Sequence, residues 1–166
     1  MKLDHSFAEE LTALASEVKP IKLKNSRLEV FNHDLATELD LPSEWQNETH
    51  LFSALYAQDG ALNRCSVAQK YGGHQFGHWN PELGDGRGLL LAETIDLQRQ
   101  RWDLHLKGAG PTPYSRFADG RAVLRSTIRE YLASEALHSL GIPTSRALCL
   151  ISSDDPIYRE KQERAA

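Results

Sequence analysis

The chain has 166 residues, of which 40% are hydrophobic and 25% are charged, and its formal net charge is −4. This length fits one domain whose core needs neither disulfides nor metal. The small negative charge argues against a nucleic-acid-binding protein that depends on bulk positive charge. Apolar runs reach only four or five residues, whereas a membrane-spanning helix needs ~20.

The sequence shows few features that indicate targeting or cysteine chemistry. No apolar signal-peptide segment follows Met1. Cys65 and Cys149 lie far apart and form neither a CxxC pair nor a zinc-binding spacing. We interpret them as buried thiols in a soluble, cytoplasmic protein that binds no nucleic acid and no membrane.

The N-terminal segment is predicted to be a helix that covers another layer of the protein. Ser6 and Glu9 match a capping box, apolar residues recur at helical spacing as far as Val18, and Pro20 closes the segment. We therefore expect an N-terminal helical extension over residues 1–27.

Short elements are predicted next. A strand is expected around residues 28–31, and Asn32 can cap a brief helix that stops before Pro42. Apolar residues at helical spacing predict another helix over residues 49–58. We therefore expect the first third of the chain to be mostly helical and to have a structural role.

Glycines then become frequent. Nine of the eleven lie between Tyr71 and Gly120, and glycine weakens a fold unless the backbone needs unusual angles or close approach to a ligand. In residues 84–88, three glycines alternate with Asp85 and Arg87, so backbone N–H groups and a guanidinium can approach a phosphate. A plain turn is the alternative interpretation. Neither a Walker A loop nor a complete Rossmann fingerprint is present.

The second half alternates strands and a helix. Residues 89–92 predict a buried strand and residues 102–107 a half-buried one, joined by a hairpin connection. An amphipathic helix is expected over residues 124–140, ended by the Gly141-Ile142-Pro143 stop signal. Another strand is expected over residues 147–151, with no closing element after it.

A lysine and a glutamate follow the glycine loop in a suggestive order. Lys107 ends the second strand, and Glu130 lies on the following helix. Glycine loop, strand lysine and helix glutamate is the order of a kinase small lobe, where the glutamate holds the lysine and the lysine holds phosphate oxygens. Glu135 is a competing partner on the same helix, and spacing alone favours Glu130 only weakly.

Two further groups have simpler explanations. Asp119 can cap the helix or bind a ribose or adenine edge, and a cap is the simpler interpretation. His74 and His78 are four apart, but neighbouring glycines disfavour a helix there and no third metal ligand is evident. We therefore predict no metal site within this chain.

Several longer strings resemble the selenoprotein O (YdiU) family. The resemblance covers residues 28–160. The strings are Tyr71-Gly72-Gly73-His74-Gln75-Phe76-Gly77, Gly84-Asp85-Gly86-Arg87-Gly88, Leu106-Lys107-Gly108-Ala109-Gly110, Arg116-Phe117-Ala118-Asp119-Gly120-Arg121, Ser126-Thr127-Ile128-Arg129-Glu130-Tyr131-Leu132 and Gly141-Ile142-Pro143-Thr144.

The resemblance implies a kinase-like fold that binds ATP in a reversed orientation and transfers AMP to Ser, Thr or Tyr hydroxyls of acceptor proteins. It implies a catalytic ion pair of Lys107 with Glu130, in which Lys107 holds phosphate. It also implies use of Mg²⁺ or Mn²⁺. The remaining nucleotide contacts that it implies are Gly84, Gly86, Arg87, Asp119 and Gly120.

Family members are much longer, and their second lobe supplies the catalytic base and the metal ligands. We therefore expect an α+β chain with a kinase-like small lobe, made of a twisted antiparallel sheet and one key helix. Its expected parts are the extension, an incomplete nucleotide-binding lobe over residues 28–160 and a tail over residues 161–166. By itself it is expected to lack transferase activity. A non-catalytic nucleotide-binding pseudoenzyme fragment, a protein uridylyltransferase and a structural fragment that binds no nucleotide remain alternatives.

Overall fold

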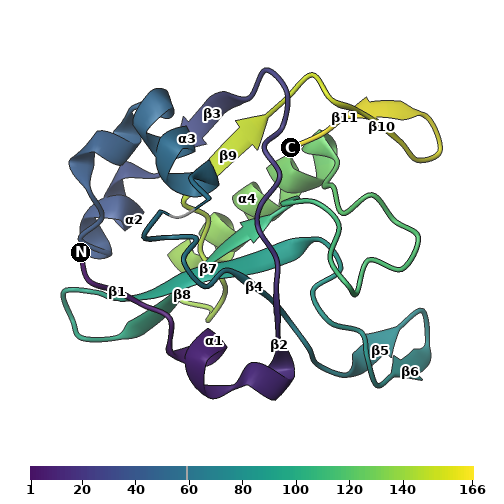
Figure 1. Cartoon of the computed structure of the whole chain (residues 1–166). Coiled ribbons are helices and arrows are strands. Elements are labelled where there is room, and N and C mark those ends of the chain that lie inside the picture. Colours follow the sequence, from purple (N-terminus) through teal and green to yellow (C-terminus); the bar gives the residue numbers. More distant parts are fainter. Residues whose placement is uncertain (59) are drawn as a thin grey trace.

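The computed structural model describes residues 1–58 and 60–166. An antiparallel sheet runs through its centre, with helices around it (Figure 1). The two long strands, β7 (Gly88–Ile95) and β8 (Arg101–Lys107), form a hairpin whose register pairs Gly88 with Lys107. The predicted strands and their hairpin connection are confirmed.

Strand β7 is the centre of this sheet. β8 pairs with one of its edges, while β1 (Leu3–Asp4) and β4 (Val67–Gln69) share the other edge. β2 (Ala15–Glu17) continues the sheet beyond β4. β7 is buried along nearly its whole length, whereas the side chains of β8 alternate between exposed and half-buried. This alternation matches the period of two that the sequence shows.

The predicted N-terminal helix is wrong in its extent. Helix α1 spans only Ser6–Glu10, and the chain returns to the sheet as β2 well before Val18. The predicted capping box is also wrong, because Ser6 lies inside the helix and its hydroxyl donates to Glu93 at 2.7 Å. Strand pairing at both ends of this segment overrides its helical periodicity.

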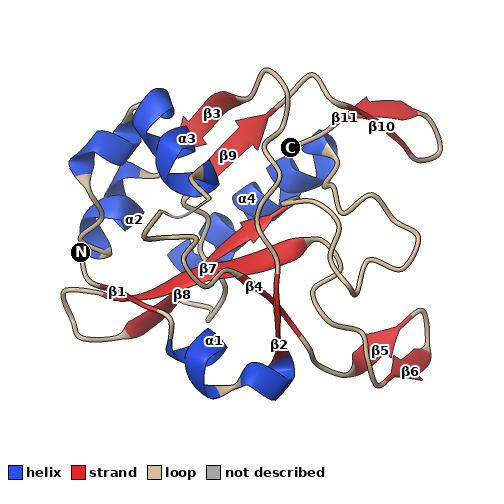
Figure 2. Ribbon diagram, in the orientation of Figure 1, coloured by secondary structure: helices blue, strands red, loops and turns tan. Residues whose placement is uncertain are grey.

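Helices α2 (His33–Glu38) and α3 (Glu48–Tyr56) confirm the predicted helices, and Asn32 caps α2 by accepting from the N–H of Leu35. Figure 2 shows these helices together on one side of the molecule. β3 (Arg27–Phe31) pairs with β9 (Cys149–Ser152) beside them. The core joins these helices to the sheet. Its buried residues include Trp45, Leu51, Phe52, Leu55, Leu62, Ala68, Leu89, Leu91, Ala92 and Ile151.

Helix α4 (Leu124–Ser139) is also confirmed, and Gly141 takes a φ of 73° just beyond its end. No side chain of this helix is buried, and Leu132 is 63% exposed. Of the apolar positions that predict an amphipathic helix, Leu124 and Tyr131 are half-buried, whereas Ile128, Leu132 and Leu140 are exposed.

Two small hairpins complete the structure. One joins β5 (Gly73–Gln75) to β6 (His78–Asn80). The other joins β10 (Pro156–Tyr158) to β11 (Gln162–Arg164). The expectation of no closing element, with a tail over the last residues, is wrong, because the buried Ala165 forms a bridge with a residue at the start of α4.

The predicted α+β class is confirmed by this mixture of antiparallel sheets and separate helices. Among the described residues, no helix is long and apolar enough to cross a membrane.

Candidate functional site

Lys107 and Glu130 meet between the end of β8 and helix α4. The ammonium group of Lys107 donates a hydrogen bond to the carboxylate of Glu130. The side chains are 41% and 53% exposed, so a ligand in solution can reach both. The pairing predicted from the order of motifs is thus present in the structure.

Glu135, the competing partner, is engaged elsewhere. It accepts hydrogen bonds from Arg146 at 2.9 and 3.0 Å, from Asn32 at 2.9 Å and from the N–H of Ala147 at 2.9 Å. The hydrogen bonds from Arg146 lower the pKa of Glu135, although burial opposes them. Because Arg146 is almost fully buried, this pair fixes α4 against the segment that leads into β9. Glu130 is left free to meet Lys107.

The glycine loop at residues 84–88 is closely packed. A Cβ atom on Gly84, whose φ is 56°, would lie 2.3 Å from the ring of Tyr114, and one on Gly86 would lie 3.1 Å from the Tyr114 carbonyl oxygen. The hydroxyls of Thr112 and Ser115 donate to the Asp85 and Gly86 carbonyls, each at 2.6 Å. The glycines therefore serve a close approach of two protein segments, and the loop does not join two paired strands as a plain hairpin turn would.

Asp85 anchors this loop, although sequence reasoning did not select it as a site residue and had only one signal that could have found it. It is buried and accepts hydrogen bonds from Tyr71 at 3.0 Å, from the N–H of Gln69 at 3.1 Å and from His105 at 3.2 Å. Burial alone would raise the pKa of Asp85, but these hydrogen bonds outweigh it and lower the pKa. Burial and the bond to Asp85 raise the pKa of Tyr71 to about 12. That signal is the position of an aspartate between two glycines of the loop.

Three loops come together beside Lys107. The N–H of Gly108 donates to the carbonyl of Arg87 at 2.7 Å, and the N–H of Gly110 donates to the carbonyl of Gly120 at 3.2 Å. Gly120 has a φ of 68°, and a Cβ atom there would lie 2.0 Å from the carbonyl carbon of Gly110. Arg121 ties the same region by donating to the carbonyl of Gly108 at 2.9 Å. We call residues 84–88, 107–110 and 119–121 the three-loop site.

Asp119 does not cap α4, so that interpretation is wrong. The N-cap position is Val123, and no side chain caps the helix. Both carboxylate oxygens of Asp119 accept from Arg159 at 2.8 Å, and these bonds lower the pKa of Asp119. The N–H of Arg121 adds a third bond at 2.9 Å.

The three-loop site carries surplus positive charge. Lys107 and Asp119 are each balanced by an ion-pair partner, and the carboxylate of Asp85 offsets one further positive charge, which leaves a surplus of one. Within the described part of the chain, Arg87 and Arg121 form no ion pair with a carboxylate, and the side chain of Arg87 is exposed. Such a surface attracts an anion.

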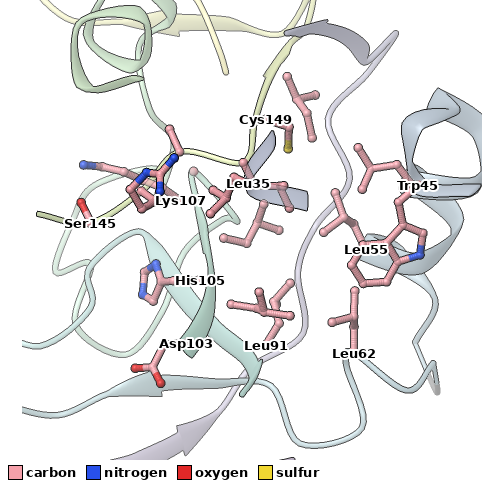
Figure 3. A pocket seen from close by; sticks show the side chains of 18 of the residues that line it. Leu35, Trp45, Leu55, Leu62, Leu91, Asp103, His105, Lys107, Ser145 and Cys149 are labelled. Atoms are coloured by element: carbon pink, nitrogen blue, oxygen red, sulfur yellow. The ribbon is translucent and has the colours of Figure 1, made fainter. Parts of the chain in front are cut away.

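A cavity of about 610 Å³ lies beside β8. Figure 3 shows Asp103, His105 and Lys107 in a row on one side of this strand and Leu91 on the other side. Burial raises the pKa of the Cys149 thiol, which also lines the cavity, to about 12. Only Lys107 and Gly108 join this largely apolar space to the three-loop site. The other predicted nucleotide contacts do not line it.

Metal-ligating side chains are dispersed. Across residues 1–58 and 60–166, no group of three or more His, Cys, Asp or Glu residues is placed to hold a metal ion. The ring of His74 instead packs edge-on against Trp79 in the β5–β6 hairpin, 5.1 Å between ring centroids.

Comparison with known proteins identifies the family. The family model described as "Protein adenylyltransferase SelO" matches residues 1–166. The chain is 62% identical over 166 residues to a protein of Pseudoalteromonas atlantica and 54% identical over 168 residues to one of Ectopseudomonas mendocina, both named "Protein nucleotidyltransferase YdiU". All of this chain is covered in both cases, but only 35% and 34% of these relatives. The chain, which spans about a third of the length of its relatives, therefore belongs to the SelO family.

Proposed function

We propose that this chain is the ATP-binding part of a protein nucleotidyltransferase that transfers AMP to Ser, Thr or Tyr hydroxyls of acceptor proteins. The ion pair of Lys107 with Glu130, set beside the three-loop site, is the observation that carries the proposal. The names of the family and of its relatives support it. A kinase-like arrangement of strand lysine and helix glutamate belongs to the same proposal.

The residues of the site have distinct proposed tasks. The ammonium of Lys107 binds phosphate oxygens, and Glu130 holds that ammonium in place. Arg87 adds an exposed guanidinium, which matches the geometry of a phosphate. Gly84, Gly86, Asp119 and Gly120 are proposed to contact the nucleotide as well. Fixed positive groups of this kind stabilise charge that develops on phosphate oxygens during transfer.

In the transfer itself, an acceptor hydroxyl oxygen forms a bond to the α-phosphorus, and the bond from that phosphorus to pyrophosphate breaks. The hydroxyl proton must pass to a base, and the family resemblance places that base outside these 166 residues. Mg²⁺ or Mn²⁺ would arrive with ATP. We therefore propose that the 166-residue chain binds ATP but does not transfer AMP. Turnover of radiolabelled ATP onto an acceptor protein by the pure chain would contradict this second point.

Calorimetry with ATP, with and without Mg²⁺, tests the binding proposal. Removing the ammonium in Lys107→Ala is expected to weaken binding about tenfold or more, since a hydrogen bond to a charged group contributes ~1.5–3 kcal/mol. Arg64→Ala is the matched control, because Arg64 forms an exposed ion pair with Glu9 and contacts none of the three loops. Equal affinities for wild type and Lys107→Ala, or no binding by the folded chain, would refute the proposal.

A further inference from the structure

The β10–β11 hairpin holds the start of α4 in place. The N–H of Ala166 donates to the carbonyl of Ala122 at 3.0 Å, and Arg125 pairs with Glu163 at 2.7 Å. Figure 1 shows this yellow hairpin next to the green segment that leads into the helix. The segment held by the hairpin includes residues 119–121 of the three-loop site.

Arg159, in the turn of this hairpin, is anchored on several sides. Its guanidinium donates to both carboxylate oxygens of Asp119 at 2.8 Å, to the carbonyl of Tyr158 at 2.9 Å and to the carbonyl of Arg121 at 3.2 Å. A bidentate guanidinium–carboxylate pair fixes the orientation as well as the charge of the carboxylate. Asp119 therefore presents its oxygens in one orientation.

The hydrogen bonds leave one acceptor position open. Oδ1 of Asp119 accepts from Arg159 and from the N–H of Arg121, whereas Oδ2 accepts only from Arg159. Each carboxylate oxygen can accept about two hydrogen bonds. Oδ2 thus has room for one more donor, and the Asp119 side chain is 38% exposed.

We propose that Arg159 is a positioning residue for nucleotide binding, which holds Asp119 so that Oδ2 accepts a hydrogen bond from the nucleoside. The donor is a ribose hydroxyl or the amino group of the base, since a carboxylate recognises either. Arg159 also neutralises Asp119, whose free negative charge would repel the phosphates of ATP. This inference rests on the proposed function, because it requires that the three-loop site binds ATP.

Calorimetry with MgATP on Arg159→Gln, Arg159→Lys and wild type tests this inference. Arg159→Gln is expected to bind about tenfold more weakly, while Arg159→Lys, which restores the charge but not the two-pronged geometry, loses about threefold. Arg27→Gln is the matched control. Arg27 forms a similarly exposed, two-pronged pair with Asp154. Its affinity is expected to equal that of wild type. If Arg159→Gln folds poorly by circular dichroism, Arg159→Lys carries the test.

Two nucleotide analogues separate positioning from a general structural role. 2′,3′-Dideoxy-ATP lacks the ribose hydroxyls, and ITP lacks the base amino group. The loss caused by Arg159→Gln is expected to shrink for whichever analogue lacks the donor. Equal losses with all three nucleotides would overturn the positioning of Asp119 for the nucleoside and leave only the neutralisation of its charge, and no loss with ATP would overturn both effects of Arg159. Either result leaves the proposed function intact. No ATP binding by wild type would overturn both the role of Arg159 and the proposed function.

Discussion

The buried carboxylate of Asp85 offers the sharpest stability prediction. Asp85→Asn keeps the shape of the side chain, but it removes the negative charge that Tyr71, His105 and the N–H of Gln69 surround and replaces one accepting oxygen with an NH₂ group. A hydrogen bond to a charged group contributes ~1.5–3 kcal/mol, so we expect a loss of about 2–3 kcal/mol at pH 7. At ~2–4 °C per kcal/mol for a chain of this size, Tm falls by about 5–10 °C.

The pH dependence follows from the lowered pKa of Asp85. A carboxyl whose pKa is lower in the folded state stabilises the fold above its unfolded pKa, and this stabilisation is lost as the pH falls through the folded value. The ordinary value is 3.8. The Tm of wild type should therefore exceed that of Asp85→Asn by the whole amount above pH 3.8, and this difference should shrink as the pH falls further.

Thermal unfolding followed by circular dichroism from pH 7 to pH 2 measures both effects. Asp103→Asn is the control, because Asp103 lies on β8, the strand that also carries His105. Burial and the charge of Glu93 raise the pKa of Asp103, so neutralising it should leave Tm unchanged or slightly higher at pH 7. An Asp85→Asn variant as stable as wild type, with no narrowing in acid, would show that the hydrogen bonds to Asp85 do not anchor the loop.

Further variants test other contacts by chemical denaturation. Gly120→Ala should lower the free energy of unfolding by about 2 kcal/mol or more, because its Cβ would overlap the backbone of Gly110. Gly77→Ala is the control: its φ is 79° but the space around it is open, so it should lose only about 1 kcal/mol. Equal losses in the two variants would contradict the packing argument. Glu135→Ala leaves the buried Arg146 guanidinium with only its longer ion pair to Glu38 at 3.4 Å among the described residues and should cost about 2–3 kcal/mol. Glu130→Ala removes an exposed pair and should cost ~1 kcal/mol or less while weakening ATP binding. The reverse order of stabilities would refute the assigned roles.

Local sequence patterns determined most of the elements in the middle of the chain. The alternation along residues 102–107, the apolar run at residues 89–92 and the stop signal after α4 each arise within one element, so their spacing predicts the structure directly. The N-terminal segment shows the limit of this reasoning. Its helical spacing is real, but pairing with strands distant in sequence decides its structure.

Most of the three-loop site was predicted from the glycine-rich strings and from the family resemblance that they carry, which also implied the pairing of Lys107. Spacing alone could not decide between Glu130 and Glu135; the family resemblance implied Glu130, and the tertiary structure shows the physical reason, because Arg146 reaches Glu135 from beyond the helix. The hydrogen bonds to Asp85 and the ion pair of Arg159 with Asp119 likewise could not be predicted from residue spacing. Each joins segments distant in sequence, and contacts of that kind exist only once the chain has folded.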